Sequence, residues 1–199
     1  MSIRKQIRRG LSWVYSYHLT VELQRQARET TDDLEGLARD ITVLSQGDRV
    51  PDLGAYFGHR QATLQRMVDD GCVVMFHRSK AGISAILMNA LSDYFEPTLQ
   101  ATIRVGPGEV YHFGYFVDPS LAKTGGAIKI GRFAVRYFSR IGRQRFFSEV
   151  KPENTTALKV NRFLGYRPSG TRIRRLRLCG LRFEWRDSNL PPLLGGRMR

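Results

Sequence analysis

Cysteine is scarce in this chain of 199 residues. Only Cys72 and Cys179 carry thiols, and neither belongs to a CxxC pair. This scarcity argues against a disulfide scaffold and against a zinc site built on paired cysteines. The four histidines show no ligand-like spacing, so we predict no bound metal. The two cysteines fit reduced core thiols in a cytoplasmic protein.

Long hydrophobic runs are also lacking. No stretch approaches the ~18 consecutive apolar residues that a membrane-spanning helix needs, so we predict no transmembrane segment. The sequence begins with a basic cluster, but Trp13, Tyr15 and Tyr17 interrupt any signal-like apolar run. We therefore expect a cytoplasmic location, with a peripheral membrane contact through this basic, aromatic start as the alternative.

Acidic residues are few in the second part of the chain, residues 119–199. The formal net charge is +14, but residues 1–118 carry a net −1 and residues 119–199 a net +15. An excess of this size indicates an anionic partner such as a phosphate-bearing cofactor, a nucleic acid or an acidic membrane surface. Whatever the basic composition implies therefore belongs to the second part of the chain.

The length and patterning fit one domain with appendages. We expect an N-terminal extension over residues 1–30 that packs on the domain, the domain itself over 31–187 and a flexible tail over 188–199. Strand-like segments at 41–44, 72–76 and 83–88 precede an expected loop at 92–108, and a helical pattern covers 60–68. Residues 173–185 read as strand with a phase slip, which predicts a turn or bulge at Cys179-Gly180.

The block from residue 110 to 141 carries the main chemical signal. A long aromatic strand over 110–117 leads into a glycine-containing loop, and apolar residues then recur at helical spacing from Ile130 to Ile141. The first amides of a helix have no intrahelical acceptors, so this arrangement can bind an anion. Neither a Walker loop nor a dinucleotide-binding fingerprint is present. A phosphate site and a simple tight turn both remain open on these grounds.

A second helix is predicted over residues 155–164. Asn154 is placed to cap its first turn, and Gly165 is placed to end it. The preceding segment, 145–150, reads as a strand.

These motifs together resemble the GNAT family of acyl-CoA N-acyltransferases. Val117-Asp118-Pro119 followed by Gly125-Gly126-Ala127 is similar to that family's V-x-P…[R/Q]-x-x-G-x-[G/A] pyrophosphate loop. The segment from Asn154 to Ala157 and the later Leu164-Gly165-Tyr166 resemble the family's N-x-x-A…L-G-[F/Y] pattern. The resemblance covers about residues 72–170.

The resemblance implies an α/β (α+β) fold with a mixed, mostly antiparallel central sheet flanked by helices. A splayed parallel strand pair, 110–117 and 145–150, would form the acyl-CoA cleft. Acetyl-CoA or another acyl-CoA would be the co-substrate, with no metal. The implied cofactor-binding residues are Phe116, Val117, Lys123, Thr124, Gly125, Gly126, Ala127 and Asn154.

Two departures from the family pattern concern the chemistry. Ala122 stands where the loop usually has Arg or Gln, which removes one side-chain contact. Asn161 stands where the family often has a tyrosine proton donor, and an amide cannot supply a proton to a thiolate. Strand alternation puts residues 109, 111, 113, 115 and 117 on one face and residues 112 and 116 on the other. The candidate catalytic residues are Glu109, Tyr111, His112 and Glu149.

The resemblance therefore implies an N-acyltransferase, most simply an N-acetyltransferase, that moves an acyl group directly from CoA to an amine. The acceptor would be a small-molecule or peptide amine, and the protein a monomer or homodimer. The alternative is a catalytically inactive module of this fold that binds acyl-CoA or a polyanion such as nucleic acid. The arginines from Arg172 to Arg182 could contact an anionic partner in either case.

Overall fold

The computed structural model describes residues 15–27, 34–179 and 181–188. The chain divides into two compact units. The larger unit comprises residues 25–96 and 102–148, and the smaller one residues 1–24, 97–101 and 149–199. The tail 189–199 and most of the N-terminal extension lie outside the described residues.

The larger unit is built on a mixed sheet in the order β8-β7-β4-β3-β2. Strands β2 (Ile41–Leu44), β3 (Val73–Ser79), β4 (Gly82–Ala90) and β7 (Glu109–Val117) pair antiparallel with their neighbours, whereas β8 (Arg145–Val150) runs parallel to β7. The strand-like segments predicted at 72–76 and 83–88 are confirmed as β3 and β4, which form an antiparallel hairpin. Their central residues are buried on both faces, which accounts for the continuous apolar runs in the sequence.

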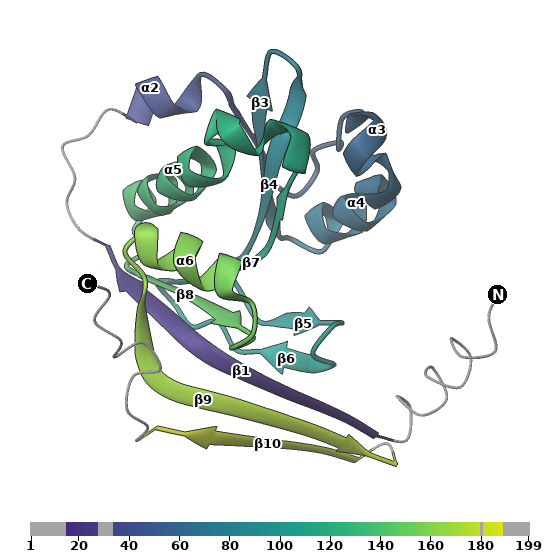
Figure 1. The fold of residues 1–199 in the computed structure, drawn as a ribbon, viewed down its shortest axis with the longest axis vertical. Helices are drawn as coiled ribbons and strands as arrows, with labels where there is room; N and C mark the ends of the chain where they lie inside the picture. The colour runs from purple at the N-terminus through teal and green to yellow at the C-terminus, as the bar shows by residue number, and fades with distance from the viewer. Residues whose placement is uncertain (1–14, 28–33, 180, 189–199) are drawn as a thin grey trace. The chain divides into compact units, whose positions relative to one another are not determined.

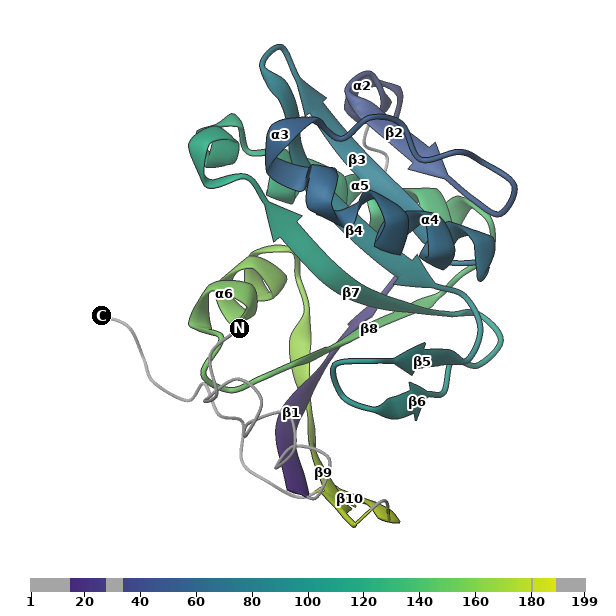
Figure 2. The same cartoon turned by 90° about the vertical axis from the view of Figure 1, so that its right-hand side faces the viewer.

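Helices cover both faces of this sheet. α5 (Gly126–Arg140) and α2 (Leu34–Ala38) lie on one face, and α3 (Gly54–Phe57), the 3-10 turn η1 (Gly58–Arg60) and α4 (Gln61–Asp69) lie on the other (Figures 1 and 2). The apolar residues of α5 at helical spacing, including Ile130, Phe133 and Phe138, are buried. The predicted amphipathic helix is therefore confirmed.

The expectation of a loop at residues 92–108 is wrong. This segment contains β5 (Tyr94–Glu96) and β6 (Ala101–Ile103), which pair as a separate two-stranded sheet. The ring of Tyr94 stacks on Phe113, with 4.4 Å between ring centroids, so a tertiary contact helps to hold these short strands. Sequence periodicity over three residues is too short to reveal them.

The described residues of the smaller unit form three antiparallel strands and one helix. Its strands follow the order β10-β9-β1, formed by Leu181–Asp187, Arg167–Leu178 and Tyr15–Gln26. Of the turn predicted at Cys179-Gly180, Cys179 is found in a turn after β9 with a left-handed φ of 49°, and Gly180 lies outside the described residues. Helix α6 (Thr155–Phe163) begins as predicted, because the Asn154 side chain accepts a hydrogen bond from the Ala157 amide at 3.1 Å.

Candidate functional site

Strands β7 and β8 pair over only part of their lengths. Their parallel register joins residues 109–111 to residues 145–147, while β7 continues to Val117. The second half of β7 is therefore not paired with β8 within this register. The strand ends at the segment predicted to bind pyrophosphate.

A bulge in β7 changes which face its later residues occupy. Phe116 pairs with Ile86 and Phe113 with Met88, so three steps along β7 match two steps along β4. Gly114 lies within the bulge at φ 55°, a conformation that glycine adopts without strain. The extra residue reverses the alternation beyond this point.

The predicted alternation is consequently wrong for the end of the strand. The Tyr115 hydroxyl donates a hydrogen bond to the Ala127 carbonyl of α5, so Tyr115 lies on the α5 face. The Arg60 guanidinium lies 3.8 Å from the centre of the Phe116 ring, which places Phe116 toward η1 on the opposite face. His112 packs near Phe138 of α5, so it shares a face with Tyr115.

The loop between β7 and α5 is a short 3-10 helix, η2 (Pro119–Thr124). Asp118 caps it by accepting hydrogen bonds from the Ser120 amide at 2.9 Å and hydroxyl at 2.7 Å. Gly125 then turns the chain into α5 with φ 70°. A Cβ added to Gly125 would point into open space, so its conformation rather than crowding requires glycine there.

Gly126 is required for a different reason. A Cβ on Gly126 would lie 2.3 Å from Ser84 Oγ and 2.7 Å from His77 Nδ1. Those two side chains are buried and lie 2.7 Å apart at hydrogen-bonding distance. The start of α5 therefore packs directly on β3 and β4, and no sequence motif indicated the two supporting residues, His77 and Ser84.

The first turn of α5 supplies the candidate anion site. Lys129 is the first residue whose amide bonds within the helix, to the Gly125 carbonyl at 3.0 Å. The amides of Gly126, Ala127 and Ile128 precede it and have no intrahelical acceptor. Lys123 and Thr124 lie in η2, one turn earlier. Helix geometry thus adds Ile128, which the motif alone did not identify.

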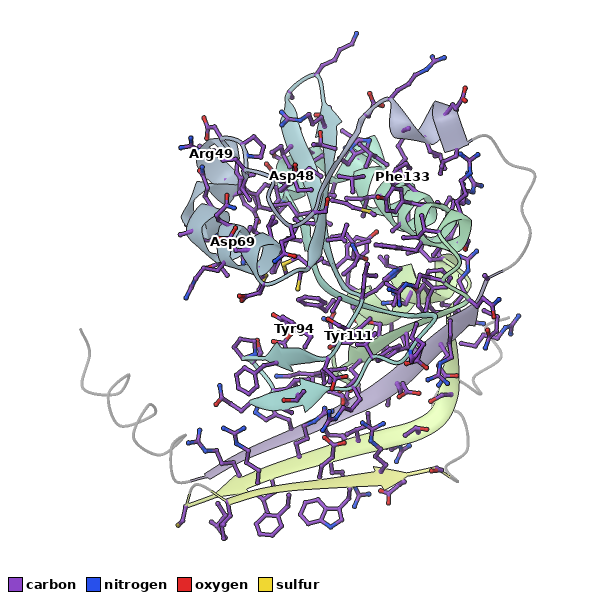
Figure 3. The ribbon with its side chains drawn as sticks, turned by 180° about the vertical axis from the view of Figure 1, so that it is seen from behind. Asp48, Arg49, Asp69, Tyr94, Tyr111 and Phe133 are labelled. Atoms are coloured by element: carbon purple, nitrogen blue, oxygen red, sulfur yellow. The ribbon has the colours of Figure 1, made fainter. Side chains whose placement is uncertain are left out.

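Two candidate catalytic residues lie at the start of β7. Glu109 forms an ion pair with Arg145 and accepts a hydrogen bond from the Gly106 amide at 3.0 Å. Tyr111 is buried and stacks on Phe113, with 5.2 Å between centroids. Figure 3 labels Tyr111 and Tyr94, whose rings both stack on Phe113. Glu109 thus already closes a turn, and Tyr111 belongs to an aromatic cluster.

His112 is enclosed by apolar rings. It lies near Phe138 and Phe146, and only 5% of its surface is exposed. Burial, with a smaller effect of the positive charge of Arg25, lowers the pKa of His112 to about 3. The imidazole is therefore neutral at physiological pH. Its burial denies it direct contact with solvent.

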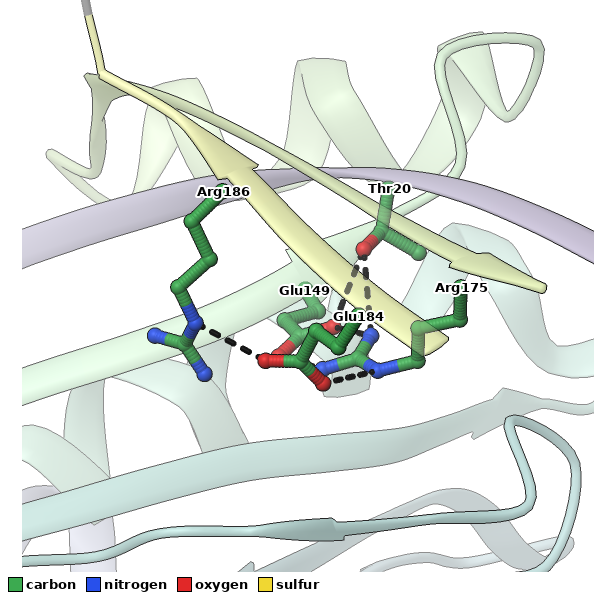
Figure 4. A network of polar contacts seen from close by, with 5 residues as sticks. All are labelled: Thr20, Glu149, Arg175, Glu184 and Arg186. Carbon is green, nitrogen blue, oxygen red and sulfur yellow. Dashed lines mark hydrogen bonds and ion pairs between the residues drawn. The ribbon is translucent and has the colours of Figure 1, made fainter. Parts of the chain in front are cut away.

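Glu149 belongs to a buried network in the smaller unit (Figure 4). Both of its carboxylate oxygens accept hydrogen bonds from the Arg175 guanidinium, at 2.5 and 3.0 Å, and the Thr20 hydroxyl donates a third at 2.9 Å. The Arg175 Nε donates to Glu184 at 2.8 Å. Glu149 and Arg175 have side chains only 1% and 5% exposed, so the two opposite charges compensate each other inside the protein.

The helix α6 carries the remaining predicted residues. Asn154 caps the helix through its side-chain oxygen, and the Asn161 amide donates to the Ala157 carbonyl one turn earlier at 2.9 Å. Asn161 is thus bonded within its own helix. No group of three or more metal-binding side chains occurs among the described residues, and no helix described is long and apolar enough to cross a membrane.

Comparison with known proteins gives matches at the level of structure. No protein-family model and no curated protein sequence matches the chain. A solved GNAT-family protein from Novosphingobium aromaticivorans, described as an acetyltransferase, matches 81% of the chain with a TM-score of 0.54 and 16% identity. A GNAT-family acetyltransferase from Colwellia psychrerythraea matches 92% with a TM-score of 0.53 and 13% identity.

A third solved structure is a glucosamine N-acetyltransferase region of a fungal multi-domain β-N-acetylglucosaminidase. It matches 92% of this chain with a TM-score of 0.51 and 16% identity. The chain spans 66%, 62% and 22% of the lengths of these three proteins, in the order given. A mostly antiparallel sheet with one parallel pair, β7 and β8, and flanking helices agrees with these matches. The chain therefore has the fold of the GNAT acetyltransferases.

Proposed function

We propose that this protein is an acyl-CoA-dependent N-acyltransferase, most simply an N-acetyltransferase. The observation that carries the proposal is the start of α5. There, the amides of Gly126, Ala127 and Ile128 follow strand β7, whose pairing with its parallel neighbour β8 ends at Tyr111, in a chain with the GNAT fold. Backbone amides at a helix N-terminus bind phosphate through hydrogen bonds and the helix dipole.

In this proposal the acyl-CoA pyrophosphate binds at the first turn of α5. Lys123 and Thr124 of η2 and the open side of Gly125 would border the phosphates. The backbone of Phe116 and Val117 would bond the pantetheine arm, and Asn154 would contact the arm from α6. The net +15 of residues 119–199 favours the negatively charged cofactor.

The reaction joins an amine nitrogen to the thioester carbonyl carbon and breaks the carbon–sulfur bond. The nitrogen must lose a proton, and the departing thiolate must gain one. Glu109, Tyr111, His112 and Glu149 remain the candidates for these transfers. Glu109 and Glu149 are paired with arginines and His112 is buried, so these environments favour direct exchange of both protons with solvent water over transfer by any of these side chains.

The acceptor class is a small-molecule or peptide amine. A monomer or homodimer would be sufficient, because every cofactor-binding residue named above comes from one chain. Cys72 is buried and Cys179 exposed, and both are unpaired, which fits a reducing compartment such as the cytoplasm.

A second function, acyl-CoA binding without turnover, is favoured by Asn161. This residue replaces the family's frequent tyrosine, and its amide is bonded to its own helix. An amide does not protonate a thiolate. The four candidate residues are also buried or engaged, which is the environment expected of structural rather than catalytic groups.

Titration calorimetry with acetyl-CoA tests binding, and thiol release over a panel of amines separates the two functions. Gly125→Ala and Gly142→Ala form a matched pair, because both glycines have left-handed φ and open space where a Cβ would be added, at opposite ends of α5. We expect Gly125→Ala to weaken acetyl-CoA binding roughly tenfold, by disturbing the first-turn amides. Gly142→Ala should bind like the wild type.

Absence of acetyl-CoA binding by the intact protein would refute both functions. Binding without thiol release from any amine would select the second function. Equal weakening by Gly125→Ala and Gly142→Ala would show that backbone strain, and not the phosphate site, causes the loss.

A further inference from the structure

The β9–β10 hairpin presents an apolar face to solvent. Antiparallel register pairs Leu181 with Leu178, Phe183 with Leu176 and Trp185 with Arg174. Directly opposed residues point to the same side of a sheet, so these residues share one face. Four large apolar side chains on it are strongly exposed: Leu178 at 45%, Leu181 at 64%, Phe183 at 42% and Trp185 at 47%.

The arrangement of these side chains is ordered along the hairpin. Leu178 and Leu181 flank the turn at Cys179, so the tip is aliphatic. Phe183 and Trp185 follow on β10, and their rings stack with 5.9 Å between centroids. A contiguous exposed apolar patch of this kind marks an interaction surface. Aliphatic tips and indole rings suit the boundary between lipid headgroups and acyl chains.

The same hairpin is strongly basic. Residues 167–187 contain seven arginines and two acids, a net +5, although one of these arginines, Arg175, is buried and paired with Glu149. Arg177, Arg182 and Arg186 lie on the face opposite the apolar one, and Arg186 is paired there with Glu184 at 2.9 Å. Clustered arginines near a membrane surface are attracted to anionic headgroups. We infer that the β9–β10 hairpin docks on an anionic lipid surface, with Leu178, Leu181, Phe183 and Trp185 entering the headgroup region.

Two other occupants fit these observations less well. A single-stranded nucleic acid would need unpaired arginines beside the aromatic rings, but Arg174 on that face is already paired with Asp187 at 3.2 Å. Leucine, moreover, has no ring on which a base can stack. A second copy of the hairpin would bring another net +5 against the first, which disfavours self-association. A lipid surface is complementary to both the apolar face and the charge.

Vesicle flotation of the full-length protein tests this inference, which does not depend on acyl transfer. Phosphatidylcholine vesicles with and without phosphatidylglycerol provide the charge comparison. We expect binding to the anionic vesicles and a steep loss of binding as salt rises. Leu181→Ser should reduce the bound fraction roughly tenfold, because less apolar surface enters the membrane.

Ile141→Ser is the matched control, since Ile141 is a similar aliphatic residue that is 56% exposed on the larger unit. It should bind vesicles like the wild type. Trp13→Phe leaves Trp185 as the single tryptophan, and its emission should shift to shorter wavelength on addition of anionic vesicles.

Equal binding of Leu181→Ser and the wild type would overturn the inference, as would an unchanged emission of Trp185. Equal binding to neutral and anionic vesicles would remove the role assigned to the arginines. Light scattering that shows a dimer lost in Leu181→Ser, or tighter binding to single-stranded DNA than to vesicles, would assign the face to another partner.

Discussion

Replacement of Gly126 by alanine tests most directly whether the start of α5 packs tightly against β3 and β4. The new Cβ would lie 2.3 Å from Ser84 Oγ and 2.7 Å from His77 Nδ1, well inside normal contact distances. Both neighbours are buried, and they lie within hydrogen-bonding distance of each other. Neither is the free end of a flexible side chain, so the backbone of α5 must move.

The expected cost follows from two opposing effects. Overpacking of a tight site costs about 1–3 kcal/mol. Alanine regains about 0.5–1 kcal/mol relative to glycine in a helix. We therefore expect Gly126→Ala to lower the free energy of unfolding by about 1–2 kcal/mol, measured by urea denaturation. Acetyl-CoA affinity should fall as well, because the displaced amides are those proposed to bind pyrophosphate.

Ser84→Ala provides the control, because it removes the atom nearest to the new Cβ. The double variant should be more stable than the sum of the two single changes predicts, and the double-mutant cycle measures this coupling. A Gly126→Ala protein with wild-type stability and wild-type acetyl-CoA affinity would refute the tight packing of α5 against Ser84 and His77.

The buried His112 and the buried Arg175–Glu149 pair allow two further predictions. His112 stays neutral in the folded protein but titrates near its ordinary value when unfolded, so the free energy of unfolding should fall by about 1.4 kcal/mol per pH unit below about pH 6.5. Urea unfolding at pH 7 and pH 5 measures this loss, and the same loss in His112→Phe would contradict the assignment. Arg175→Met should cost about 3–5 kcal/mol by leaving Glu149 buried without its partner. Adding Glu149→Gln should recover most of that cost, and a failure to recover it in thermal or urea unfolding would argue against the buried pair.

Local signals in the sequence predicted much of the fold. The cap at Asn154, the turn at Cys179 and the apolar spacing of α5 depend on residues within a few positions of one another, and each is found in the structure. The GNAT resemblance itself rested on two such local segments, around Gly126 and Asn154, and the solved neighbours agree with it at the level of fold.

Features set by distant pairing could not be predicted in the same way. The bulge at Gly114 exists because β7 pairs with β4, so strand alternation alone assigned Tyr115 to the wrong face. The pairing of Glu149, named as a candidate catalytic residue, could not be foreseen because its partner, Arg175, lies 26 residues away in the sequence. Ser84 and His77 support Gly126 through a tertiary contact that no motif reveals.

The two thiols of the chain differ greatly in reactivity. Burial is the main reason that the pKa of Cys72 is raised to about 12, so little nucleophilic thiolate forms there at neutral pH. Cys179 is exposed at the tip of the β9–β10 hairpin. The wild-type protein therefore carries a selective attachment point for a fluorophore or spin label, at the tip between Leu178 and Leu181, without any engineered cysteine.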